Sequence, residues 1–175
     1  MLRNILYGAV LGGAVVAMAG PACAQSASLT DGQILQYVQT VNNGEIGDAK
    51  LAMRRSKSAD VKAFAKHMLD DHSRSEKAIS EAAKKAKMKL ANSDVTAALK
   101  NEAEAGDKEL KAAKDAEFDK QYVQAQAKMH GEVATTIQTK LMPAATSEAV
   151  KSALTQTLST VQEHQRMAED LAGKV

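Results

Sequence analysis

Apolar residues recur every three or four positions through most of the chain beyond residue 30, which is the spacing of helices that bury one face. No segment there alternates apolar and polar residues with the period of two that is typical of a strand. The stripes predict four long helices, over about residues 30–55, 58–90, 117–142 and 147–171. The pattern therefore favours an all-α protein.

The expected helix ends carry recognisable signals. Thr30 with Gln33 three residues later forms a capping box, in which each side chain satisfies a free backbone N–H at the helix start. Ser58 precedes the second helix with Asp60 in its first turn, and Pro143 ends the third.

The segment Ala91–Asp115 has a weaker pattern and contains Asn92, Ser93 and Gly106, so we expect a connection with short helical pieces. Two helix hairpins joined by such a long connection predict a ferritin-like four-helix bundle spanning residues 25–175.

The first 24 residues have the three parts of a secretory signal peptide. Arg3 is followed by the uncharged, mostly apolar run Ile5–Ala19 and then by Ala22-Cys23-Ala24, which predicts cleavage before Gln25. The run is shorter than the roughly 20 apolar residues of a membrane-spanning helix. We therefore expect an exported protein of the periplasm or cell envelope, with no transmembrane segment in the mature chain.

Composition excludes several classes of function. The chain has 23 Lys and Arg against 21 Asp and Glu, so net charge gives no general attraction to nucleic acid. Its few Phe and Tyr residues make no stacking platform for nucleic-acid bases. Beyond the leader there is no cysteine and no recognisable nucleophile motif, so the sequence indicates no enzymatic reaction.

Each predicted helix carries one good metal ligand within its buried stripe. These four residues are Glu45, His72, His130 and His164. Buried polar groups are costly unless they are paired, and imidazole with carboxylate suits Zn, Fe, Mn or Cu. The stripes therefore predict one transition metal ion in the bundle core.

Nearby residues extend this hypothesis. Asp48 is a further candidate ligand, and three acidic residues are candidates to orient the histidine rings: Asp71, Asp119 and Glu163. Three methionines near the histidines would suit Cu(I), although methionine is more commonly a core filler: Met68, Met129 and Met167. His67 is off the stripe, so we expect it at the surface.

Helix geometry supports some of these ligands better than others. About a bend near Lys57, Glu45 and His72 differ in level by roughly 4–5 Å, which side chains can bridge. About a bend near Ala144, His130 and His164 differ by roughly 9 Å, which counts against His164. The alternative is that these polar residues bond to one another without a metal, in a structural or protein-interaction bundle.

Several stretches of the sequence resemble a known family. They include Val61-Lys62-Ala63-Phe64-Ala65, Met68-Leu69-Asp70-Asp71-His72, Phe118-Asp119-Lys120-Gln121-Tyr122 and Glu163-His164-Gln165-Arg166-Met167. Together they resemble exported bacterial proteins of unknown function with a ferritin-like fold, often labelled outer membrane proteins. The resemblance implies an envelope location and no established activity.

One departure from ferritin-like di-iron proteins matters. Those proteins place Glu-x-x-His on two helices, whereas Leu69 and Val161 stand three residues before His72 and His164. Oxidase or iron-storage chemistry is therefore disfavoured, which leaves a mononuclear site or a vestigial one.

Mass spectrometry of the mature N-terminus tests the predicted export. We expect a chain that begins at Gln25, because small residues precede that bond. The rival is lipidation of Cys23, which is disfavoured because Gly20 stands where a lipoprotein signal usually has Leu. A chain starting at an acylated Cys23 would contradict the prediction.

Overall fold

The computed structural model describes residues 28–175, so the predicted leader Met1–Ala24 lies outside the described residues. The described part consists of helices joined by short turns and contains no strand, which confirms the all-α prediction. The elements are α1 (Asp31–Arg55), α2 (Ala59–Lys85), α3 (Asp94–Ala112), α4 (Asp115–Thr136), the π-helical segment η1 (Ile137–Leu141), α5 (Met142–Ala144) and α6 (Glu148–Ala172).

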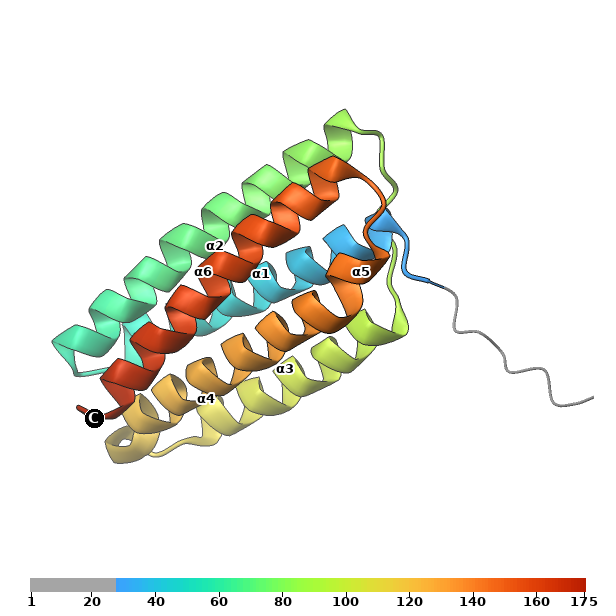
Figure 1. Cartoon of the computed structure of the whole chain (residues 1–175). Coiled ribbons are helices and arrows are strands. Elements are labelled where there is room, and N and C mark those ends of the chain that lie inside the picture. Colours follow the sequence, from blue (N-terminus) through green and yellow to red (C-terminus); the bar gives the residue numbers. More distant parts are fainter. Residues whose placement is uncertain (1–27) are drawn as a thin grey trace, which may run out of the picture.

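The long helices pack as two hairpins. α1 packs along α2, and α4, continued by η1 and α5, packs along α6 (Figure 1). α2 and α6 bring the hairpins together on one side, while α3 lies along α1 and α4 (Figure 1). None of the described helices is long and apolar enough to cross a membrane.

The helix starts follow the predicted capping chemistry. The Gln33 backbone N–H donates to Thr30 Oγ1 (3.3 Å), and the Thr30 N–H donates to Gln33 Oε1 (2.9 Å), which completes the capping box. Ser58 Oγ accepts from the Val61 N–H in the same way.

The segment Ala91–Asp115 differs from our expectation. Most of it forms the continuous 19-residue helix α3, with Ser93 as its N-cap. The helix buries only Thr96, Leu99 and Leu110, so its apolar stripe is too thin to be recognised from the sequence. Gly106 is accommodated within the helix and does not interrupt it.

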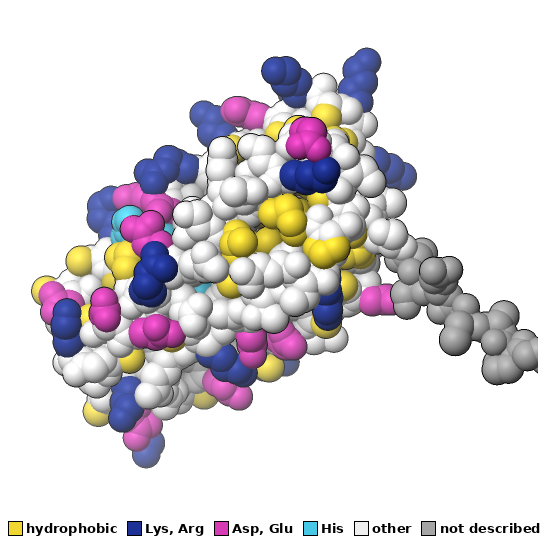
Figure 2. Space-filling model, viewed as in Figure 1, with side chains coloured by type: hydrophobic (Ala, Val, Ile, Leu, Met, Phe, Trp, Pro, Cys, Tyr) yellow, Lys and Arg dark blue, Asp and Glu magenta, His cyan; other side chains and the backbone are white. Residues whose placement is uncertain are grey.

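The core consists of two apolar clusters separated by a polar layer. One cluster contains Ile34, Val38 and Val133, and the other contains Ala52, Phe64 and Tyr122. Along each long helix, buried polar residues lie between the two, and we call them the polar layer: Asn42, Glu45, His72, Gln126, His130 and His164. Outside this core, the face shown in Figure 2 carries interspersed basic and acidic side chains.

Arg55 joins the end of α1 to the turn between α3 and α4. Its guanidinium donates to the backbone oxygens of Leu110 (2.8 Å), Lys111 (3.2 Å) and Ala113 (2.6 Å) and to Asp115 Oδ1 (3.1 Å). It also lies 4.4 Å from the centre of the Phe118 ring. A single planar group therefore satisfies the carbonyls at the end of α3 and holds the start of α4.

We predict that Arg55→Lys lowers the free energy of unfolding by about 1–3 kcal/mol, because an ammonium cannot reproduce the planar fork. Arg54→Lys, at the exposed neighbouring position, is the matched control and should change it by less than about 0.5 kcal/mol. Urea unfolding measures both, and equal effects of the two substitutions would contradict the role assigned to Arg55.

Candidate metal centre

Three of the four candidate residues come together in the polar layer. The ring centres of His72 and His130 are 5.7 Å apart, those of His72 and His164 are 5.2 Å apart, and those of His130 and His164 are 5.3 Å apart. One nitrogen from each ring lies within 4.8 Å of the others. The side chains are at most 3% exposed, so three facing helices supply a buried group of imidazoles.

Each imidazole is held by a hydrogen bond from one of its nitrogens. His72 Nδ1 donates to Asn42 Oδ1 (3.0 Å), and His130 Nδ1 donates to the Gln126 carbonyl (2.8 Å). His164 Nε2 donates to Asp71 Oδ2 (3.2 Å). A backbone carbonyl and a carboxylate, the partners of His130 and His164, are among those that usually orient histidine ligands of metals.

The second nitrogen of each ring has no hydrogen-bond partner among the described residues: His72 Nε2, His130 Nε2 and His164 Nδ1. Burial lowers the pKa of His72 to about 2, and the neighbouring rings add to this effect. Burial likewise lowers the pKa of His130 to about 4 and lowers that of His164. At neutral pH the rings are uncharged, and each has a lone pair available to a metal.

The expected mismatch between His130 and His164 is wrong. The turn between the helices is centred near Thr146, so His130 lies 16 residues before it and His164 lies 18 after it. The difference in level is therefore about 3 Å, and it arises because the chain remains helical through Ala144.

Glu45 lies in the polar layer but is not part of the group of three histidines. It is fully buried, and burial, with a smaller effect from Asp48, raises its pKa well above the usual value. Burial also raises the pKa of Asp48 to about 6. Tyr122 is near both carboxyls, and its pKa is raised by burial and then by Glu45 and Asp48.

Sequence reasoning missed Asn42. This residue lies 15 residues before Lys57 and His72 lies 15 after it, so the two are level across the hairpin. The Asn42 amide N–H donates to Ser75 Oγ (3.0 Å), which leaves its oxygen free to accept from His72. Comparing the distance from the hairpin bend for every polar residue of the stripe, rather than for the candidate metal ligands alone, would have identified Asn42.

The flanking residues have mixed outcomes. Asp71 orients His164 as expected, whereas within the described structure Asp119 and Glu163 make no hydrogen bond to a histidine. The side chain of His67 is 42% exposed, as expected of a surface residue, and its Nε2 also lies 3.5 Å from Asp71 Oδ2. Met68 is buried in an apolar cluster, as expected of a core filler.

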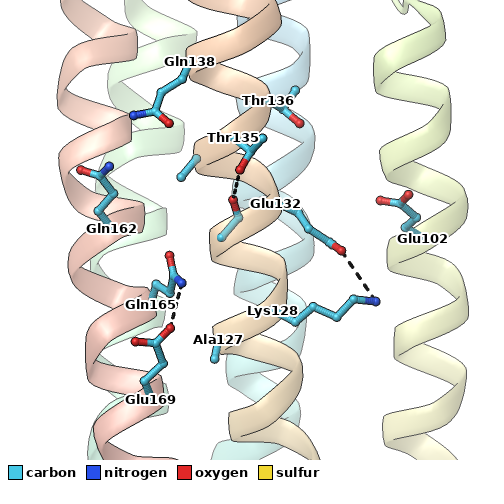
Figure 3. Close-up of a pocket in the computed structure, with 12 residues that line it drawn as sticks. Glu102, Ala127, Lys128, Glu132, Thr135, Thr136, Gln138, Gln162, Gln165 and Glu169 are labelled. Atoms are coloured by element: carbon cyan, nitrogen blue, oxygen red, sulfur yellow. Dashed lines mark hydrogen bonds and ion pairs between the residues drawn. The ribbon is translucent and has the colours of Figure 1, made fainter.

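Two clefts differ in their relation to this centre. A shallow groove of about 800 Å³ along α4 and α6 is lined by polar side chains such as Gln162 and Gln165, and none of the four candidate residues lines it (Figure 3). A second cleft, of about 410 Å³, is lined by Asn42, Asp71 and His72 together with residues of α6. The second cleft therefore reaches the polar layer.

The fold and this cluster define an all-helical protein with a candidate metal centre. The chain belongs to the family described as Domain of unknown function (DUF4142), which matches residues 16–171. This membership confirms the resemblance to a family without assigned function. No curated protein matches the sequence.

A solved structure described as "CopM in the Cu(II)-bound form" has a similar fold. The TM-score is 0.63 at 11% sequence identity, and the match covers 84% of this chain and 98% of that chain. At this identity the similarity concerns the fold alone.

We predict that Glu45→Gln stabilises the chelator-treated protein at pH 7 by more than about 1 kcal/mol, since a tenfold change in proton binding corresponds to about 1.4 kcal/mol. Folding raises the pKa of Glu45, so as the pH rises above 4.5 this carboxyl ionises in the unfolded chain while it stays protonated in the folded one. Ionisation therefore stabilises the unfolded state, and the free energy of unfolding falls. The gain should therefore disappear towards pH 4.

Urea unfolding between pH 4 and pH 8 measures this difference, with Glu104→Gln on the exposed surface of α3 as the control. A Glu45→Gln protein that is less stable than the parent at pH 7 would contradict the prediction.

Proposed function

We propose that this protein binds one transition metal ion through His72, His130 and His164 and acts in metal handling or protection against metal stress. The observation that carries the proposal is that the two nitrogens of each ring have different surroundings. One nitrogen is held by a protein acceptor, and the other is buried without a partner among the described residues. Buried polar atoms are normally satisfied, so three such nitrogens within one cluster support a shared ligand.

Copper is our first choice among Zn, Fe, Mn and Cu. Imidazole nitrogen suits Cu(II) and Zn(II) better than harder ions that prefer oxygen donors. The similarity of fold to a protein described in a Cu(II)-bound form adds support for copper. Three histidines also leave one ligand position open for water or another donor.

Glu45 remains the candidate for a fourth ligand in this proposal. It is buried in the same layer, and its two carboxylate oxygens have no hydrogen-bond partner within residues 28–175. Asp48 would then act through Glu45, whose pKa it helps to raise.

Two further parts of the proposal come from the sequence. We propose that the hairpins and the connection containing α3 form a ferritin-like bundle, but one without the Glu-x-x-His pair of di-iron proteins. We also propose export to the periplasm or envelope, which would suit a protein that takes up metal ions outside the cytoplasm.

We predict that the parent protein binds one Cu(II) per chain and that His72→Ala with His130→Ala weakens this binding by more than about 100-fold. The reason is that changing even the partners of metal ligands commonly costs about 10–100-fold in affinity. Metal analysis after dialysis and competition with a chelator of known affinity measure the change. Gln124→Ala on the exposed side of α4 is the control.

Thermal unfolding supplies an independent readout of the same prediction. Metal at 100 times its dissociation constant should stabilise the parent by about 2.7 kcal/mol and leave the double variant unchanged. Equal, near-zero metal content in both proteins, with no effect of a chelator on Tm, would instead support the metal-free bundle.

A further inference from the structure

A second group of possible ligands lies beside the three buried histidines and shares one of them. It consists of His67, Asp71 and His164, each offering one atom within 4.8 Å of the others. Asp71 Oδ2 is 3.2 Å from His164 Nε2 and 3.5 Å from His67 Nε2. All four histidines of the chain therefore belong to one continuous cluster.

The two groups differ in access to solvent. The buried rings are at most 3% exposed, whereas the side chains of His67 and Asp71 are 42% and 17% exposed. Figure 2 shows histidine atoms at the surface among basic and acidic side chains. The His67 Nε2 atom is itself buried and has no hydrogen-bond partner among the described residues, but the two side chains are partly exposed, so this outer pair lies nearer to solvent than the buried group.

Sharing His164 limits how the groups can be occupied. A neutral imidazole has a single lone pair at a time, because its other nitrogen carries the proton. His164 can therefore complete one group or the other, which favours one ion that moves between them over two ions bound together.

We propose that His67, Asp71 and His164 form an outer site that a Cu(II) or Zn(II) ion occupies on its way to and from the buried histidines. This inference rests on the proposed metal binding at His72, His130 and His164. Asp71 supplies the negative charge that attracts the cation, and its other oxygen pairs with Arg74. The Arg74 guanidinium partly neutralises that charge and slows the approach of the ion.

Stopped-flow loading of the full chain with Cu(II), alongside equilibrium titration, tests the outer site. His67→Gln should slow both loading and release by about tenfold, because it removes one of the three ligands of the outer site, while changing Kd by less than about twofold. Both rates fall because the same site serves entry and exit. The partial exposure of His67 makes the substitution compatible with folding, which the Tm of the variant checks.

Arg74→Gln should change loading in the opposite direction, accelerating it about threefold by freeing the Asp71 charge. Lys77→Gln removes a charge from the next turn of α2 and should accelerate loading less. Equal acceleration by the two substitutions would contradict the assignment of the effect to Asp71.

The remaining outcomes separate this inference from the proposed function. Unchanged loading of His67→Gln, a weaker Kd that makes His67 a resident ligand, or two ions per parent chain would each overturn the outer site while leaving the buried one. Absence of Cu(II) binding by the parent, or binding that survives His72→Ala with His130→Ala, would overturn the proposed function and this inference with it.

Discussion

The arrangement of this bundle depends on burying three imidazoles side by side without charging them. Burial lowers the pKa of each ring, and the neighbouring rings lower the pKa of His72 and His130 further, while Asp71 partly opposes the effect of burial on His164. A neutral ring in a core still needs a partner for its N–H, and Asn42, the Gln126 carbonyl and Asp71 each provide one at the right level. The bonds from His72 to Asn42 and from His164 to Asp71 each join two helices, so a shift of one turn would break them, whereas the acceptor of His130 lies on its own helix.

The apolar clusters on either side of the polar layer provide the stability that the layer does not. Ile34, Ile137 and Leu154 are fully buried in one cluster, and Val61, Tyr122 and Ala168 in the other. Hydrophobic burial is non-directional, so these clusters hold the helices together without choosing among closely related registers. The hydrogen bonds of the rings are directional and therefore favour one register of the helices, as buried polar residues do in some coiled coils.

The sequence predicted the parts of the structure that leave a periodic signal. The four long stripes, the caps at Thr30 and Ser58 and the histidines of the core follow from spacing and residue type. α3 was missed because it buries only three residues, and Asn42 because an uncharged amide is not recognised as part of a metal site. The level of His164 relative to His130 depends on where the chain turns between their helices. Placing that turn two residues too early lengthens one arm of the hairpin and shortens the other, so the expected difference in level is too large by four residues. His67 is at the surface as expected, but its contact with Asp71 was not predicted, because the stripe ignores contacts made at its edge.

The orientation of the rings has a consequence for the affinity of the proposed metal site. Each imidazole is fixed by hydrogen bonds to the chain itself, so ordering the ligands does not have to be driven by the metal. This differs from small zinc domains, in which metal binding provides the free energy of folding. A metal that bound to a site ordered in this way would cost little conformational entropy, which would favour affinity and also allow rapid exchange with the proposed outer site, because no refolding would intervene. For the proposed function, a preformed buried group beside a partly exposed one is therefore better suited to taking up and releasing an ion than to holding it permanently in the structure.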